Sequence, residues 1–211
     1  MAGVVVVGVG PGIGLAVAKR FVREGMSAGL IARSEATVKA AAEKLAGDVL
    51  PVTADVTDEA GLRSALDRIV EAHGVPDVVI YNAALIQSDR IGDLTAQQHR
   101  DAWAVNVVGA MTTAAHLAPA MAERGSGSFL ITGGMPQPKP DYASLSLGKA
   151  GVRALVTLLH QQYGAAGVHA ASVTVSGGVG VGTGWEPDEI ANHYWRLHQQ
   201  APADWIQEIV I

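Results

Sequence analysis

The sequence predicts a doubly wound α/β fold, a parallel sheet of about seven strands with helices on both faces. Three observations lead to this prediction. Short runs of valine, isoleucine and alanine alternate with longer helical stretches along the chain, as strands covered on both faces require. Helix breakers lie close to the ends of the helical stretches. The irregular segments follow predicted strands, at the edge of the sheet where such folds bind ligands.

The first half of the chain alternates strictly between the two kinds of element. An unbroken valine run predicts the first strand, and apolar runs such as "SAGLIA" and "VVIY" predict the later ones. The stretches between them are amphipathic or alanine-rich, and each ends close to a glycine. We therefore predict strands at 3–9, 27–32, 48–54 and 76–82, and helices at 13–25, 34–46 and 58–73.

The second half continues the alternation with longer helices. The segment "RGSGS" ends one helical stretch, Gly164 ends another, and Glu186-Pro187-Asp188 begins a third with acidic residues in its first turn. The chain closes on "WIQEIVI", which is typical of a strand. We predict helices at 96–123, 143–164 and 187–199, strands at 127–132, 168–175 and 206–211, and irregular segments at 84–94, 133–141 and 176–186.

Length and composition favour a single globular domain over residues 1–211, because this length supports one hydrophobic core. A net charge of −5 gives no basic surface for nucleic acid. The chain has no cysteine, which excludes disulfides and thiolate sites, and its histidines show no metal-binding spacing. The opening "MAGVVVVGVG" lacks a basic region and is too short for a signal peptide or a membrane span, so we expect a cytoplasmic protein.

A glycine cluster follows the first predicted strand and precedes a helix, in "VVVVGVGPGIG". Gly8, Gly12 and Gly14 fit the spacing GxxxGxG, whereas no set of glycines here fits GxGxxG. Glycine allows a tight turn and close approach of the backbone to a pyrophosphate, and the helix N-terminus favours the anion. The loop therefore predicts a dinucleotide-binding, Rossmann-type site, and the alternative is a tight turn without a ligand.

Further motifs appear in a fixed order along the chain. Asp55 lies in "ADVTD" after the third predicted strand, Asn82 lies in "YNAA" after the fourth, and Asn106 ends "WAVN" in the following helix. Lys149 lies in "SLGKAG" near the start of the next helix. With the glycine loop, these motifs resemble those of the short-chain dehydrogenase/reductase family over nearly the whole chain. One departure is Ala84, where the family usually has glycine.

The resemblance implies an oxidoreductase that binds a nicotinamide dinucleotide and a small-molecule substrate. In the family, residues at the positions of Asp55, Asn106 and Lys149 hold the adenine, a water of the proton relay and the nicotinamide ribose. A threonine near the position of Thr183 contacts the nicotinamide side. The cofactor-binding residues implied for this chain are Gly8, Gly12, Ile13, Gly14, Asp55, Val56, Asn82, Ala83, Ala84, Lys149 and Thr183.

The end of the second predicted strand indicates which nicotinamide cofactor binds. An acidic residue there would bond the ribose 2′-hydroxyl, whereas arginine pairs with a 2′-phosphate. In "GLIARSE" the acidic position is occupied by Ala32, and Arg33 and Ser34 follow. This favours NADP(H) over NAD(H). The alternative is that Arg33 is a solvated surface residue and Ser34 only the N-cap of the next helix.

The catalytic acid of the family is missing from its expected position. The family's tyrosine, which protonates the substrate carbonyl oxygen, lies four residues before the lysine, and Leu145 occupies that position here. The family's upstream serine or threonine corresponds either to Thr132, by its distance from Leu145, or to Gly133, when "ITG" is paired with "ISS".

Tyr142 is the candidate replacement acid, seven residues before Lys149. On one continuous helix the two residues would lie roughly 10 Å apart along the axis. Tyr142 can therefore serve only if the helix begins after it and the preceding loop, which contains Pro138 and Pro140, folds back. Ser144 and Ser146 are nearer in sequence, but a serine hydroxyl is a poor general acid, and capping is the better interpretation of both.

These observations leave two hypotheses. In the first, the protein is an NADP(H)-dependent oxidoreductase acting on a carbonyl, an alcohol or an activated alkene with an altered acid. In the second, it is a non-catalytic nucleotide-binding sensor, scaffold or partner subunit. The resemblance also implies a homodimer or homotetramer paired through the helices at 96–123 and 143–164. The segment 176–186 is short for a substrate lid, which predicts an open or partner-covered pocket.

Overall fold

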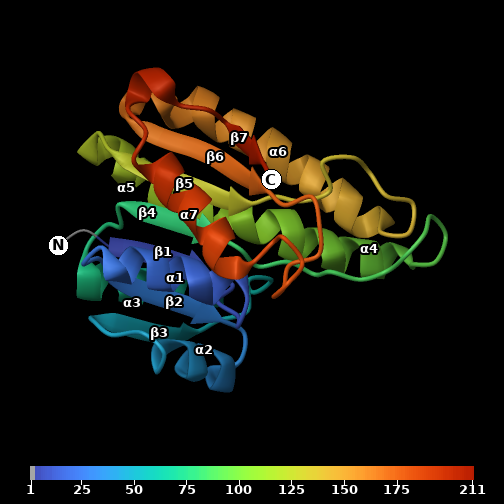
Figure 1. Ribbon diagram of the computed structural model, residues 1–211, viewed down its shortest axis with the longest axis horizontal. Coiled ribbons are helices and arrows are strands. Elements are labelled where there is room, and N and C mark those ends of the chain that lie inside the picture. The colour runs from blue at the N-terminus through green and yellow to red at the C-terminus, as the bar shows by residue number, and fades with distance from the viewer. Residues whose placement is uncertain (1–2) are drawn as a thin grey trace.

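The computed structural model describes residues 3–211 and contains one seven-stranded sheet (Figure 1). All neighbouring strands are parallel, in the order β3-β2-β1-β4-β5-β6-β7. In this register Val5 of the interior strand β1 lies between Gly29 of β2 and Val79 of β4. The strands are β1 (Gly3–Val7), β2 (Ser27–Ala32), β3 (Val49–Thr53), β4 (Val78–Tyr81), β5 (Gly127–Thr132), β6 (Val168–Thr174) and β7 (Glu208–Val210).

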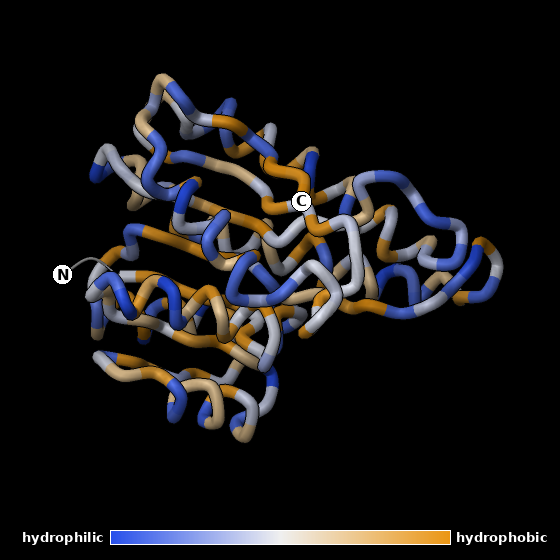
Figure 2. Tube along the Cα trace, in the orientation of Figure 1, coloured by the Kyte–Doolittle hydropathy of each residue, from blue (hydrophilic) through white to orange (hydrophobic). Residues whose placement is uncertain are grey.

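Helices cover both faces of the sheet, and each face has its own apolar core. Val4 and Val6 of β1 pack with α1 and α7, whereas Val5 and Val7 pack with α3, α5 and α6, because successive strand side chains point to opposite faces. The strands accordingly follow the hydrophobic stretches of the chain (Figure 2). The main helices are α1 (Ile13–Arg23), α2 (Glu35–Ala42), α3 (Glu59–His73), α4 (Ala96–Trp103), α5 (Gly109–Arg124), α6 (Ala143–Tyr163) and α7 (Pro187–His198).

This architecture confirms the predicted doubly wound fold. Met1 and Ala2, at the start of the predicted domain, lie outside the described residues. Predicted and observed strand ends differ by up to two residues. The loops after β4, β5 and β6 are irregular, as predicted, and all three lie at the carboxyl edge of the sheet, at the right of Figure 1. Within residues 3–211, no helix has the length and apolar character needed to cross a membrane.

The prediction of one continuous helix at 96–123 is wrong, because the structure divides this segment into three elements. α4 ends at Trp103, a π-helical turn, η1, spans Ala104–Val108, and α5 begins at Gly109. The phenol of Tyr81 explains the interruption: it donates a hydrogen bond of 2.5 Å to the carbonyl of Val105. Gly109 leaves room for the ring, since a Cβ there would lie 2.3 Å from the Tyr81 oxygen. Such turns within helices often mark functional sites.

Candidate functional site

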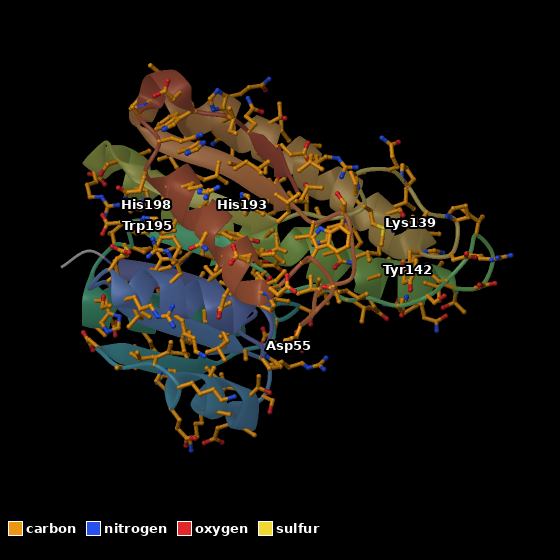
Figure 3. All side chains as sticks on the ribbon, viewed as in Figure 1. Asp55, Lys139, Tyr142, His193, Trp195 and His198 are labelled. Atoms are coloured by element: carbon orange, nitrogen blue, oxygen red, sulfur yellow. The ribbon has the colours of Figure 1, made fainter. Side chains whose placement is uncertain are left out.

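A cleft of about 900 Å³ lies at the carboxyl edge of the sheet. It runs from the ends of β2 and β3, past the glycine loop after β1, to the start of α6. Asp55 marks the β3 end, and Lys139 and Tyr142 lie toward the other end of the same edge (Figure 3). The lining includes Gly8, Gly12, Ile13, Gly14, Arg33, Ser34, Asp55, Val56, Asn82, Ala83, Ala84, Tyr142, Leu145 and Lys149.

The three glycines of the loop differ in what they permit. Gly8 has φ +90, and a Cβ there would lie 2.3 Å from the backbone nitrogen of Ala83. A Cβ on Gly14 would lie 2.8 Å from the carbonyl oxygen of Gly8. A Cβ on Gly12 would meet nothing within 4 Å, and no side chain caps α1 at this N-cap residue. Gly12 therefore opens the N-terminus of α1 to the cleft, where backbone N–H groups favour an anion.

Asn82 fixes the loop from β4. Its amide nitrogen donates to the carbonyl of Gly8 at 2.8 Å, and its amide oxygen accepts from the hydroxyl of Thr132 at 2.7 Å. The Thr132 hydroxyl has one proton, so the phenol of Tyr194, 2.7 Å away, donates to Thr132. Tyr194 comes from α7 and is fully buried, and burial raises the pKa of its phenol. This chain of hydrogen bonds turns the Thr132 hydroxyl toward α7.

The end of β2 places the Arg33 cation beside the Ser34 hydroxyl, and Asp55 lies across the cleft. Ala32 is buried, and Arg33 is exposed at the cleft. Ser34 is the N-cap residue of α2, yet its hydroxyl makes no cap hydrogen bond. Asp55, across the cleft, accepts from the backbone nitrogen and hydroxyl of Thr57, at 2.9 and 2.8 Å. The first of these bonds is the main reason why the pKa of Asp55 is lowered, and the nearby Arg33 charge acts in the same direction.

Lys149 reaches the cleft from α6 and is 6% exposed. Its Nζ donates to the carbonyl oxygen of Thr132 at 2.6 Å. Burial lowers the pKa of this ammonium from 10.5 to about 8. None of the ion pairs found within residues 3–211 includes it. Lys149 is thus a buried cation held by one main-chain acceptor.

No tyrosine hydroxyl stands one turn before Lys149. Leu145 occupies that position, lines the cleft and is 4% exposed. Tyr142 is the N-cap residue of α6, with φ −142 and ψ 50, so the helix begins after it, and its side chain also lines the cleft. Ser144 and Ser146 are buried and lie outside the lining. The hydroxyl of Ser146 accepts from the backbone nitrogen of Lys139 at 3.0 Å.

Two residues that the resemblance implies for the site face elsewhere. Asn106 lies in η1, is 1% exposed, and clamps the backbone of Leu85: its amide oxygen accepts from the Leu85 nitrogen at 2.9 Å. Thr183 lies outside the cleft lining, and its hydroxyl donates to the carbonyl of Gly180 at 2.7 Å. After β6 the cleft is instead lined by residues 175–179. The hydrogen bonds of both side chains therefore stabilise loops at this edge.

Sequence reasoning missed the residues that hold the loops around the site. Asp89, in the loop after β4, is 2% exposed and accepts from the backbone nitrogen of Ser144 at 3.0 Å. Arg153, on α6, donates to the carbonyls of Gly134 and Met135 at 3.2 Å each. Met135 has φ 48, a conformation that favours glycine. The isolated carboxylate and arginine carry no local signal, since their partners lie in other segments of the sequence.

Comparison with known proteins identifies relatives of this chain. The sequence profile of short chain dehydrogenases matches residues 2–184. Probable oxidoreductase EphD of Mycobacterium tuberculosis is 35% identical over 129 residues, which cover 60% of this chain and 22% of that protein. Glucose 1-dehydrogenase of Gluconobacter oxydans is 30% identical over 177 residues, 81% of this chain and 66% of that protein. The chain therefore spans less than two thirds of the length of each.

The fold also resembles solved structures over its full length. A metagenomic short-chain oxidoreductase, crystallised in complex with NADP, superimposes with a TM-score of 0.88 at 24% identity. The match covers 99% of this chain and 96% of the other. At this identity the likeness concerns the fold.

Proposed function

The chain belongs to the short-chain dehydrogenase family, and on this basis we propose that it is an NAD(P)-dependent oxidoreductase with a preference for NADP(H). Its substrate would be a small molecule carrying a carbonyl, an alcohol or an activated alkene. We further propose that residues 1–211 act as one domain, because the described strands β1 to β7 form a single sheet.

The residues of the cleft fit a nicotinamide dinucleotide. The open N-terminus of α1 at Gly12 would bind the pyrophosphate, and Asp55 and Val56 would line the adenine. Asn82 holds the glycine loop in position, and Lys149 would bind the nicotinamide ribose. The bound dinucleotide supplies a hydride. Ala83, Ala84 and Ile13 would complete the contact surface.

A phosphate-binding group at the end of β2 supports NADP(H). Arg33 provides the charge, and the Ser34 hydroxyl, which makes no cap hydrogen bond, provides a donor. Ala32 offers no carboxylate that would repel a 2′-phosphate. The same structure counts against Ser34 acting as a side-chain cap, which was the alternative interpretation.

The part of the site that would supply a proton to the substrate differs from that of the family. Tyr142, water and the substrate itself are the proton sources that the sequence leaves open. Thr132 is the one described hydroxyl at the end of β5, and it faces Asn82 and Tyr194. General acid catalysis contributes roughly 10²–10⁴-fold to such reactions, so ordinary ketones should be reduced slowly. An activated alkene, which is protonated on carbon, would depend less on this group.

The glycine loop carries this proposal, because Gly12 leaves the start of α1 uncapped at the cleft. The test is a fluorescence titration of the purified protein with NADPH, and with NADH alongside. Tight NADPH binding with weak NADH binding is the expected result. Absence of binding by either nucleotide would refute the proposal.

The second candidate is a non-catalytic nucleotide-binding protein. Leu145 favours it, because the family's acid is absent while the cofactor residues remain. The two candidates differ in turnover: an enzyme would consume NADPH with some substrate, whereas a sensor, scaffold or partner subunit would bind NADPH without consuming it.

A further inference from the structure

Three hydroxyl groups around the start of α6, those of Thr132, Ser144 and Ser146, are engaged with other parts of the protein. Thr132 donates to Asn82, at 2.7 Å. The Ser144 hydroxyl lies 3.4 Å from the Gln87 amide nitrogen, outside the cleft lining. The Ser146 hydroxyl is tied to the backbone of Lys139 at both its nitrogen and its oxygen. Ser144 and Ser146 lie outside the cleft lining, and Thr132, which lines the cleft, already donates its one hydroxyl proton to Asn82.

Lys149 is placed differently. It lines the cleft one helical turn from Leu145, and only one of its three N–H groups has an acceptor, the Thr132 carbonyl. No carboxylate pairs with it in residues 3–211. Leu145 and Lys149 line the same cleft, and a leucine side chain, shorter than tyrosine, places no hydroxyl there. This part of the cleft suits a substrate oxygen or one bridging water.

We propose that Lys149 is itself the proton donor when this protein reduces a carbonyl, replacing the tyrosine that Leu145 displaces. The inference rests on the proposed function. The carbonyl carbon accepts the hydride that the cofactor supplies, and its oxygen takes the electron pair of the π bond. One N–H bond of Lys149 breaks as the proton moves to that oxygen, directly or through a water. Solvent then reprotonates the neutral amine.

The acidity of Lys149 suits this role. Burial lowers its pKa to about 8, so at neutral pH the group is still mostly protonated but gives up its proton more readily than an exposed lysine. An acid must be protonated to act. The rate should therefore be constant below this pKa and fall as the pH rises through it.

The experiment compares the wild type with Lys149→Arg and Lys149→Met, using NADPH and 9,10-phenanthrenequinone as the carbonyl probe. Arginine keeps the positive charge and the hydrogen-bond donors, but its pKa is too high for it to donate a proton in this pH range. We expect Lys149→Arg to lower kcat at least about 100-fold while NADPH affinity changes less than about threefold. Lys44→Arg, at an exposed lysine beyond α2, is the matched control and should leave both unchanged.

A second readout does not depend on turnover. Lysines labelled biosynthetically with ¹³C are titrated by NMR, and the signal missing in Lys149→Arg identifies Lys149. Its midpoint should coincide with the midpoint of the fall in kcat of the wild type. A purely structural lysine would give no such coincidence.

Each contrary result has a distinct meaning. Absence of binding by both NADPH and NADH would refute the proposed function as a whole. NADPH binding without quinone reduction, or full kcat in Lys149→Arg, would overturn the role of Lys149 alone. Loss of turnover in Tyr142→Phe with turnover retained in Lys149→Arg would assign the proton to Tyr142 and overturn it equally.

Discussion

Leu145 offers a direct way to test what the site lacks. Leu145→Tyr would place a phenol one turn from Lys149, whose positive charge favours the ionised phenol and so makes it a better acid. We expect kcat for a carbonyl probe to rise about 10-fold or more, within the range of general acid catalysis. The measurement is steady-state NADPH oxidation with 9,10-phenanthrenequinone.

Leu145→Phe is the matched control for that substitution, because it adds the same ring without the hydroxyl. Equal rates in the two variants would show that bulk, and not proton donation, alters turnover. They would contradict the interpretation that turnover is limited by the absence of an acid at position 145.

Arg33 carries the prediction on cofactor choice. Removing the guanidinium in Arg33→Ala removes a charge-assisted pair with the 2′-phosphate, and NADPH should bind about 10-fold more weakly. NADH lacks that phosphate, so its affinity should be unchanged. Fluorescence titration measures both, with Arg23→Ala, at an exposed arginine at the end of α1, as the control. An equal loss for the two nucleotides would contradict the assignment.

At the scale of single residues, the sequence predicts which residues lie at the cleft better than it predicts where their side chains point. The motifs placed Asn82, Asp55 and Lys149 in one cleft, because motif positions after parallel strands share an edge. They did not predict that the Thr132 hydroxyl points toward α7, since its partner Tyr194 lies 62 residues away in sequence. Nor did the motifs predict that the Thr183 hydroxyl donates to the carbonyl of Gly180 within the turn at 180–185.

Among the elements, α6 has an unusual N-terminus. Its N-cap residue is Tyr142, which cannot cap with its side chain, and Asp89 from the loop after β4 bonds the Ser144 nitrogen instead. Asp89→Ala should therefore lower the free energy of unfolding by about 1–2 kcal/mol. Urea unfolding at pH 7 measures this. Asp89→Asn keeps an acceptor oxygen and should recover part of the loss, and identical stabilities of all three proteins would refute the cap.

The same cap predicts a dependence on pH. Burial opposes ionisation of Asp89, but hydrogen bonds to Ser144 and Gln87 outweigh it and hold its pKa below the ordinary value. A pKa lowered by folding adds stability that is complete above the unfolded value of about 3.9 and is lost as the pH falls through the folded value. The difference between wild type and Asp89→Ala should thus be full at pH 7 and smaller at pH 3, and a difference that grows on acidification would contradict this.

The strands were predicted well because their apolar runs are short and bounded by breakers. The interruption of the helix at 104–108 was not predicted. A 3.6-residue period shows where apolar residues recur, but it does not show where one turn takes an extra residue. The cause of the interruption, the Tyr81 phenol, lies in another element. The motif "YNAA" predicted roles for Asn82, Ala83 and Ala84 but none for Tyr81.

For the whole molecule, an apolar surface on α5 and α6 supports the proposed oligomer. Met111 is 50% exposed, and Leu147 and Leu158 are 56% and 59% exposed on one face of α6. Pairing with a second copy would bury them. We expect the wild type, at 21.8 kDa per chain, to sediment as a dimer or tetramer and Met111→Glu/Leu158→Glu as a monomer. Val181→Glu, at a 94% exposed site in the loop after β6, should not change the mass. A monomeric wild type would refute the oligomer.

The number of residues in the π-helical turn η1 also determines how α4 and α5 are rotated relative to each other. One residue more than an α-helical turn rotates α5 by about 100° relative to α4 around their common path. On one side of the turn Trp103 packs against Gly151, and within it Asn106 clamps Leu85 at the cleft. A single deletion at 104 or 105 would put these two contacts out of phase, so that one is kept only at the expense of the other. The number of residues in this turn thus links a contact of the half-exposed Trp103 to a contact at the cleft.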